Sequence, residues 1–286
     1  MRQILCFGDS NTYGLIPGTA NRYSWGTRWT SILDEKLQFY GYRVAEEGLC
    51  GRTTMFADAY RPGRSGSDML PAILETHRPL ELVVLMLGTN DCKAAYETTP
   101  EKIGVGIERL LDQIWRERED LPVLLISPIH LGADVEKYDR EFDRRSVEVS
   151  KGLKRVYEQI AKRRGIAFLA ASDVALPGEK DQEHMTREGH AALAEAVFEK
   201  VREILLEKED SRLIGHDFLC ISIDRLRIGC YSSDRTKISD HMMWVSKVPN
   251  YDAYGLFRAL HSHNPPKYSH IVGLSSHFYA HIGAGH

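Results

Sequence analysis

The sequence predicts an α/β fold in which a parallel sheet is covered by helices on both faces. Up to about residue 207, short apolar runs alternate with longer amphipathic segments. The short runs are apolar throughout, which is typical of parallel strands that are buried on both sides. Five strands are therefore expected at residues 4–7, 42–45, 82–87, 123–126 and 166–170.

Helices are predicted between these strands from the spacing of apolar residues. In the last of them, Leu193, Val197 and Val201 recur every four residues and form one apolar face. Pro100 suits the first position of a helix, and Thr99 before it suits the cap. The predicted helices span residues 28–40, 67–77, 100–118, 144–164 and 187–206.

Composition and charge narrow the class of protein. A chain of 286 residues can bury a full-sized core, and its formal net charge of -3 argues against a nucleic-acid partner. No apolar run is long enough to span a membrane, and the first residues lack the pattern of a secretory signal. The five cysteines are widely spaced and do not suggest a disulfide framework. We expect a cytoplasmic protein without a membrane partner.

The composition changes after residue 207. Eight of the twelve histidines fall in this last part, and glutamate is absent beyond Glu209. Residues 219–223 and 226–230 alternate like strands, but no clear fold emerges. Imidazole suits zinc, copper and nickel, yet the histidine spacing matches no established metal site, so we expect no metal there. We predict one domain over residues 1–207 and an extension of unknown fold over 208–286.

Ser10 lies in the first of three loops that are expected at one edge of the sheet. In open parallel sheets, ligands bind beyond the carboxyl ends of the strands. The loop after the first strand reads Gly8-Asp9-Ser10. A serine at this place exposes its hydroxyl and its N–H at the sheet edge, as a nucleophile requires. The alternative is a strand-to-helix turn that Ser10 or Asn11 caps.

The loops after the second and third strands offer candidate hydrogen-bond donors. Gly51 can bring its N–H close to a ligand because no side chain stands in the way. Arg52 more often fixes such a loop through hydrogen bonds than takes part in catalysis. Asn90 presents an uncharged amide donor, which suits an oxyanion that forms only in the transition state. The alternative is that Asn90 and Asp91 form a turn that caps the next helix.

Asp181 and His184 lie just before the last predicted helix. An aspartate in this position can accept the Nδ1–H of the histidine and leave Nε2 free to take a proton from a serine. A pair in a surface loop is the alternative, because this spacing is common. His190 is expected to be a packing residue. The same is expected of His130, although it follows the fourth strand and can border a pocket.

In combination, these residues resemble the SGNH, or GDSL, hydrolase family. The resemblance covers residues 2–206 and looks closest to the arylesterase and acyltransferase branch. It implies a flavodoxin-like, three-layer α/β/α sandwich with five parallel strands. The four blocks that carry the resemblance are Gly8-Asp9-Ser10, Gly51, Gly88-Thr89-Asn90-Asp91 and Asp181-x-x-His184.

The resemblance also implies an activity and a mechanism. Ser10 would attack an ester carbonyl, and Asp181 and His184 would activate it. An oxyanion hole would be formed by the N–H groups of Ser10 and Gly51 and the side chain of Asn90. No metal or organic cofactor is implied, and a homo-oligomer is expected. The predicted substrates are small short-chain esters, either aryl or alkyl acetates or acetylated sugars. Acyl transfer is a variant, and a catalytically silent binding protein is the alternative.

The sequence departs from the family pattern between Asp181 and His184. The family often has Gly and an apolar residue where this chain has Gln182 and Glu183. Glu183 places negative charge beside the base. The alternatives are that it raises the pKa of the base or contacts substrate, but we expect its side chain to point to solvent. A substrate pocket is predicted from Asn11, Tyr13, Trp25, Arg52, Met55 and His130.

Overall fold

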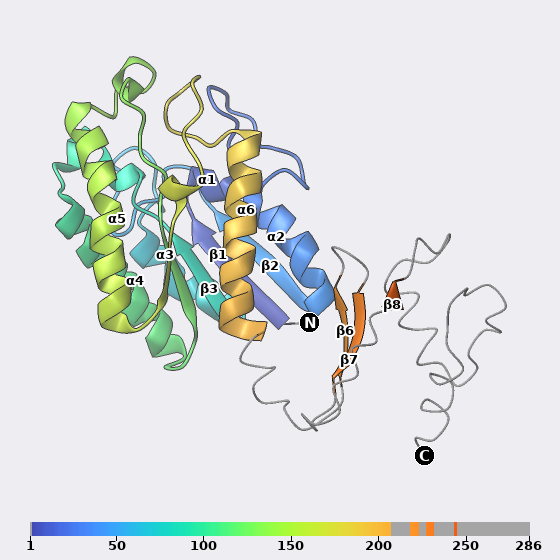
Figure 1. Ribbon diagram of the computed structural model, residues 1–286. Helices are drawn as coiled ribbons and strands as arrows, with labels where there is room; N and C mark the ends of the chain where they lie inside the picture. Colours follow the sequence, from blue (N-terminus) through green and yellow to red (C-terminus); the bar gives the residue numbers. More distant parts are fainter. Residues whose placement is uncertain (1, 207–217, 223–226, 232–242, 245–286) are drawn as a thin grey trace, which may run out of the picture. The chain divides into compact units, whose positions relative to one another are not determined.

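The computed structural model describes residues 2–206, 218–222, 227–231 and 243–244 (Figure 1). The chain divides into two units, Met1–Ser211 and Arg212–His286, and each is described by itself. The eight histidines beyond residue 207 and the predicted domain boundary lie outside the described residues. The expectation that this part of the chain binds no metal therefore stays a prediction.

The first unit contains a five-stranded sheet in which all neighbouring strands are parallel. The strand order is β2-β1-β3-β4-β5, which is the flavodoxin-like order of doubly wound folds. The predicted fold is thus confirmed. The strands are β1 (Arg2–Gly8), β2 (Tyr42–Gly48), β3 (Leu80–Met86), β4 (Val123–Ser127) and β5 (Ala167–Ala170).

Helices connect these strands close to the predicted positions. Thr99 caps its helix as expected, because its hydroxyl accepts the N–H of Lys102 at 3.3 Å. Two α-helices are shorter than predicted. The first continues as a 3-10 turn over Gln38–Tyr40, and the last continues as a π-helix over Arg202–Leu206. The helices are α1 (Ser10–Tyr13), α2 (Trp29–Leu37), α3 (Gly66–Thr76), α4 (Pro100–Glu117), α5 (Arg144–Arg164) and α6 (Arg187–Val201).

The sheet separates two apolar cores. Leu5 and Phe7 of β1 pack into the core beneath α3, α4 and α5. Ile4 and Cys6 of the same strand pack into the core beneath α2 and α6 (Figure 1). All four side chains are fully buried, which explains why this strand shows no alternation of apolar and polar residues. The described helices therefore cover both faces of the sheet.

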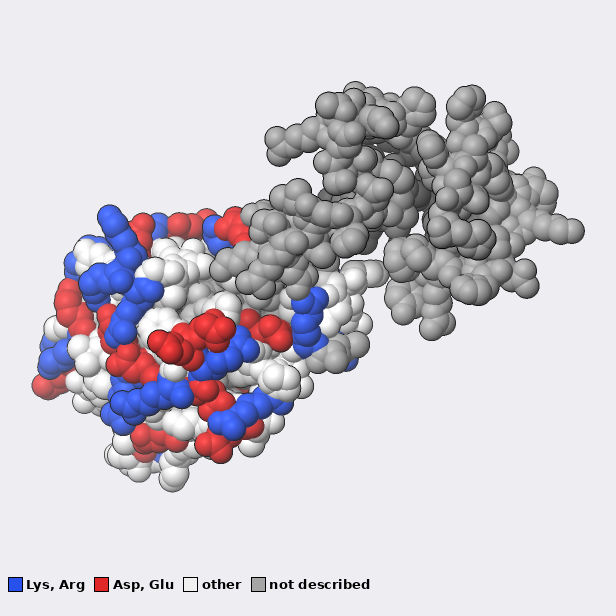
Figure 2. Space-filling model, turned by 90° about the horizontal axis from the view of Figure 1, so that it is seen from below, with Lys and Arg blue, Asp and Glu red and all other residues white. Residues whose placement is uncertain are grey.

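The surface of the first unit carries charges of both signs. Lysine, arginine and acidic side chains are interspersed on the face seen in Figure 2. Ion pairs between α5 and α4 join Arg155 to Glu101 at 2.6 Å and Arg163 to Glu108 at 2.8 Å. Exposed pairs of this kind each stabilise a protein little. Among the helices that the structure describes, none is long and apolar enough to cross a membrane.

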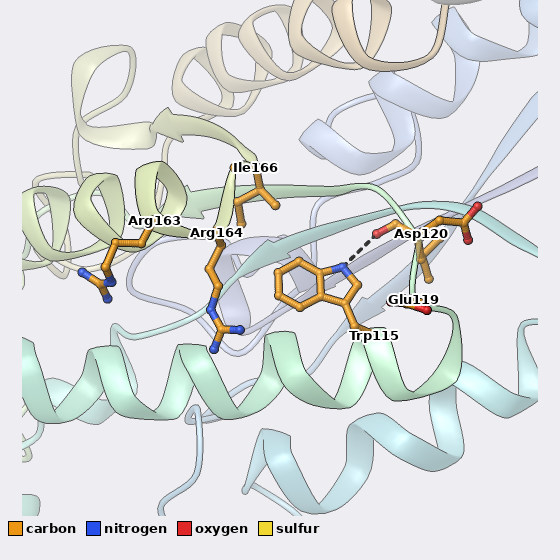
Figure 3. Close-up of a pocket in the computed structure, with 8 residues that line it drawn as sticks. Trp115, Glu119, Asp120, Arg163, Arg164 and Ile166 are labelled. Carbon is orange, nitrogen blue, oxygen red and sulfur yellow. Dashed lines mark hydrogen bonds between the residues drawn. The ribbon is translucent and has the colours of Figure 1, made fainter.

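A surface depression lies between the carboxyl-terminal ends of α4 and α5 (Figure 3). Arg164 lies over the ring of Trp115, 5.5 Å from its centroid, and the indole N–H of Trp115 donates to the carbonyl of Leu121 at 3.2 Å. Both helices lead from here into the amino ends of β4 and β5. The depression is therefore at the opposite end of the sheet from the loops that follow β1 and β3.

The described residues of the second unit form a three-stranded antiparallel sheet of order β6-β7-β8. Two of its strands differ by one residue in position from the segments 219–223 and 226–230, whose sequence alternates like strands. The strands are β6 (Phe218–Ser222), β7 (Arg227–Tyr231) and β8 (Met243–Trp244).

Candidate active site

Ser10 is separated from the end of β1 by Asp9 alone and is the first residue of α1. Asp9 caps this short helix, because its carboxylate accepts the N–H of Asn11 at 2.9 Å. The first N–H groups of a helix have no acceptor within the helix, so the N–H of Ser10 is available to a ligand. Ser10 itself is only 2% exposed. The turn thus presents a hydroxyl and an N–H in a largely covered position.

Ser10, His184 and Asp181 form a continuous hydrogen-bonded chain. The Oγ atom of Ser10 lies 2.8 Å from Nε2 of His184. Nδ1 of the same ring lies 2.9 Å from Oδ2 of Asp181. A carboxylate accepts hydrogen bonds, so the neutral ring carries its proton on Nδ1 and offers Nε2 as an acceptor to the serine. This is the order of groups that activates a serine nucleophile.

The loop before α6 fixes the carboxylate of Asp181. Its Oδ1 atom accepts the N–H groups of Glu183 and His184, each at 3.0 Å, and its Oδ2 atom accepts the N–H of Gly18 at 2.7 Å. Burial opposes ionisation, but the hydrogen bonds and charge of His184 outweigh it and lower the pKa of Asp181 to about 2. Asp181 is therefore ionised at neutral pH and can stabilise an imidazolium.

His184 is 6% exposed, and burial disfavours its charged form. The hydrogen bond to Asp181 and the negative charge of Glu183 outweigh burial, so the pKa of His184 is raised above its ordinary value. The ring is thus set to accept and hold a proton.

The prediction that the side chain of Glu183 points to solvent was wrong. The residue is 6% exposed, and its Oε1 atom lies 3.7 Å from Nε2 of His184. The physical reason is the turn at Gln182, which has a left-handed φ of 62° and whose carbonyl accepts the N–H of Gly132 at 2.7 Å. The carbonyl of Glu183 is held in turn by the amide of Asn11 at 3.3 Å. Burial raises the pKa of the Glu183 carboxyl to about 7.

Arg52 connects the three loops at this edge of the sheet. Its guanidinium donates to the carbonyl of Gly8 at 2.9 Å and to that of Glu47. Its own carbonyl accepts the side-chain N–H of Asn90 at 3.2 Å. Burial lowers the pKa of Arg52 to about 10, and the side chain lies over the ring of Phe7. As its hydrogen bonds are made to backbone, Arg52 holds the loops, in line with the role expected of it.

Two candidate oxyanion donors lie beside these contacts. Gly51 has a φ of +83°, and a Cβ atom there would come within 2.9 Å of the guanidinium carbon of Arg61. The Arg61 side chain can move, so it is the positive φ that favours glycine at this turn. Asn90 is buried, and its amide uses one N–H on the carbonyl of Arg52. A primary amide has two N–H groups, so the second remains for a ligand.

Gly88 and Asp91 set the position of the third loop. Gly88 has a φ of +128°, and a Cβ atom there would lie 2.4 Å from the hydroxyl oxygen of Tyr157. Asp91 is fully buried and accepts hydrogen bonds from the N–H of Thr54 at 2.9 Å and from its hydroxyl at 2.5 Å. Burial raises the pKa of Asp91 to about 7. Asp91 thus joins the third loop to the second, a contact that the sequence gives no signal for.

Asn11 joins the serine loop to the histidine loop. Its amide donates to the carbonyl of Glu183 at 3.3 Å and accepts the N–H of Met185 at 3.0 Å. The indole N–H of Trp29 donates to the backbone carbonyl of Asn11 at 3.1 Å. These contacts bring Ser10 and His184 together, and they occupy the amide that was predicted to line a pocket.

The other predicted pocket residues differ in their exposure. Trp25 is 48% exposed, and Tyr13 is partly buried beneath the guanidinium of Arg22, which lies 4.4 Å from the ring centroid. Met55 and His130 are partly buried as well. Their contact with a substrate stays a prediction.

His190 is a packing residue, as expected. It is fully buried, and its Nδ1 atom accepts the N–H of Trp29 at 3.3 Å. Burial lowers its pKa to about 4, so the ring is neutral at physiological pH. Within the part of the chain that the structure describes, no group of three or more His, Cys, Asp or Glu side chains is arranged to hold a metal ion.

Comparisons with known proteins agree with this geometry. Residues 6–192 match the sequence model of the GDSL-like lipase/acylhydrolase family. The structure of an M. smegmatis aryl esterase is 33% identical and covers 72% of this chain and 100% of its own, with a TM-score of 0.66. A carbohydrate acetylesterase from Sinorhizobium meliloti has the same identity and coverages, with a TM-score of 0.65. No curated protein matches the sequence significantly.

Proposed function

Because the chain belongs to the GDSL-like lipase/acylhydrolase family and is a carboxylic ester hydrolase, we propose that it is a serine esterase that cleaves short-chain esters through an acyl-enzyme on Ser10. The observation that carries the proposal is the chain of hydrogen bonds from Ser10 through His184 to Asp181, at 2.8 Å and 2.9 Å. Similarity to a protein named as an aryl esterase and to one named as a carbohydrate acetylesterase supports the same substrate class.

The first half of the reaction transfers the acyl group to the enzyme. Ser10 Oγ attacks the ester carbonyl while its proton moves to Nε2 of His184. Asp181, which is ionised, stabilises the imidazolium that forms. The carbonyl oxygen becomes an oxyanion, and the N–H groups of Ser10 and Gly51 and the free N–H of Asn90 are its proposed donors. When the carbon–oxygen bond breaks, Nε2 returns the proton to the leaving alcohol.

The second half releases the acid. A water molecule takes the place of the alcohol, His184 accepts one of its protons, and the resulting hydroxide attacks the acyl carbonyl. The bond to Ser10 breaks, and the proton on Nε2 returns to the serine oxygen. An alcohol in place of water would give acyl transfer by the same steps. No step needs a cofactor.

Burial of the reacting groups supports a short acyl chain. Ser10, His184 and Asn90 are 2%, 6% and 3% exposed, so little open surface surrounds the reacting carbon. An acetyl group needs less room than a long fatty acyl chain. The proposed substrates are therefore acetates of aryl, alkyl or sugar alcohols.

Substitution of the nucleophile tests the proposal. Wild-type protein should hydrolyse p-nitrophenyl acetate faster than p-nitrophenyl esters of longer acids. Ser10→Ala should lower kcat by roughly 10⁴- to 10⁶-fold, the scale that is seen when a triad serine is removed. Ser24→Ala is the matched control, because Ser24 is exposed and lies outside the hydrogen-bonded chain. Full activity of Ser10→Ala would overturn the mechanism, and an inactive wild type would favour a silent binding protein.

A further inference from the structure

We propose that Glu183 recognises a hydroxyl group on the alcohol part of the substrate, next to the ester oxygen, and so directs the enzyme to esters of polyols. The proposal rests on the proposed function, because it assumes that His184 returns a proton to the leaving alcohol. It concerns the alcohol that the enzyme releases, not the acyl group that it holds.

The side chain of Glu183 is largely buried and lacks a hydrogen-bond donor among the described residues. Glu183 is 6% exposed, and among the described residues no N–H or O–H group donates to its side chain. Its Oε1 atom lies 3.7 Å from Nε2 of His184, which is longer than a hydrogen bond. Burial is the main cause of its raised pKa, and the charges of Asp139, Asp181 and Asp9 add to the rise, but a carboxylate cannot donate a hydrogen bond to it. Neither carboxyl oxygen is fully enclosed, so a ligand at Nε2 of His184 can reach the group and donate the hydrogen bond that the protein does not supply.

The position of Glu183 selects the part of the ligand that it can reach. The oxygen of the leaving alcohol must come within about 3 Å of Nε2 of His184 to receive its proton. Oε1 of Glu183 lies 3.7 Å from that same nitrogen. A hydroxyl on the neighbouring carbon of the alcohol is separated from the leaving oxygen by two carbon atoms. It can therefore reach the carboxyl while the leaving oxygen is on Nε2.

The charge around the site favours an uncharged hydroxyl over an anionic group. The negative charges of Asp139, Asp181 and Asp9 act on Glu183, so an anion on the alcohol would be repelled. A hydroxyl donates to the carboxylate when Glu183 is ionised and accepts from the carboxylic acid when Glu183 is protonated. Recognition is therefore maintained on both sides of the pKa of about 7. The substrate class that follows is the acetate of an uncharged vicinal diol, glycerol or sugar.

Two esters of equal size test the proposal. 2-Hydroxyethyl acetate carries a hydroxyl at the proposed position, and n-propyl acetate carries a methyl group there. Both form the same acetyl-enzyme, so deacylation is identical. We expect the wild-type kcat/KM to favour the hydroxyethyl ester by about tenfold or more after division by the rates of alkaline hydrolysis. Equal values for the two esters would overturn the role of Glu183.

Variants assign the preference to Glu183. Glu183→Leu should reduce the ratio of the two kcat/KM values to about one, whereas Glu183→Gln should keep part of it, because an amide also binds a hydroxyl. A change that acts through His184 affects both esters alike and leaves the ratio unchanged. Glu179→Gln is the matched control, because Glu179 is an exposed carboxylate of the same loop, and it should keep the wild-type ratio. An unchanged ratio in Glu183→Leu would contradict the proposal.

The proposal and the proposed function fail in different ways. A wild-type protein that forms an acetyl-enzyme on Ser10 but shows no preference contradicts only the role of Glu183. A protein that cleaves these esters without Ser10 contradicts the function on which the proposal rests.

Discussion

Oε1 of Glu183 lies 3.7 Å from Nε2 of His184, the nitrogen that also binds the hydroxyl of Ser10. Both residues are buried, so the charge of one acts strongly on the other. Asp181 and Asp9 add negative charge around the same ring. His184, the proposed base, is therefore influenced by several carboxyl groups, and its protonation depends on theirs.

The pH dependence of activity should reflect this surrounding charge. His184 must be neutral to accept the serine proton, and its pKa is raised from the ordinary value of 6.5. The kcat/KM of the wild type for p-nitrophenyl acetate should therefore rise with pH through a midpoint above 6.5. Glu183→Gln removes a negative charge that stabilises the imidazolium, so its midpoint should move to lower pH. An identical midpoint in both proteins would show that Glu183 does not act on the base.

The stability of the protein should depend on Glu183 in a pH-dependent way. Its pKa is about 7 in the folded protein against an ordinary value of 4.5, so the folded state holds the proton more tightly. The stabilisation is complete below pH 4.5 and is lost as pH rises through 7. The Tm of Glu183→Gln minus that of the wild type should therefore be larger at pH 8 than at pH 5. In a unit of this size, each kcal/mol of added stability raises Tm by about 2–4 °C. A difference in Tm that is the same at both pH values would contradict this account.

The charge of Asp181 should be necessary for catalysis. Asp181→Asn keeps the shape of the side chain but removes the charge that holds the imidazolium, and the amide can stabilise the wrong tautomer. We expect kcat/KM to fall by roughly 10³- to 10⁴-fold in ester hydrolysis. Asp173→Asn is a suitable control, because Asp173 is an exposed partner of Lys154. A loss of less than tenfold in Asp181→Asn would mean that another group orients His184.

Removal of the Asn90 amide should slow the chemical step. Asn90→Ala deletes a proposed donor to the oxyanion, which is present in the transition state and not in the bound ester. We expect kcat to fall by about 10²- to 10³-fold with little change in KM. Because the amide also donates to the carbonyl of Arg52, the Tm of the variant must be measured in parallel. A rise in KM at constant kcat would indicate that Asn90 binds substrate and does not stabilise the oxyanion.

The sequence predicted the sheet and the hydrogen-bonded chain of Ser10, His184 and Asp181 because these follow from local patterns and one topological rule. Strands that are apolar throughout gave the parallel sheet, and its carboxyl edge brought the loop of Ser10 close to that of Asn90. The spacing of Asp181 and His184 indicated their hydrogen bond.

The direction of Glu183 could not be predicted in this way. It depends on the left-handed backbone of Gln182 and on a hydrogen bond from Gly132, which lies far away in the sequence. The contacts of Asn11 with Glu183 and Met185 are similarly distant. Side-chain directions in loops are set by such long-range contacts, and residue spacing does not encode them.

Covalent labelling with diethyl p-nitrophenyl phosphate tests the central claim most directly. The reagent phosphorylates a serine only where a base activates it and donors hold the phosphoryl oxygen. Peptide mass spectrometry of the wild type should find a single diethylphosphoryl group per chain, on Ser10, with release of p-nitrophenol in equal amount. Ser10→Ala should remain unlabelled. Labelling at another residue, or an unlabelled wild type at a pH where His184 is neutral, would contradict the assignment of Ser10 as the nucleophile.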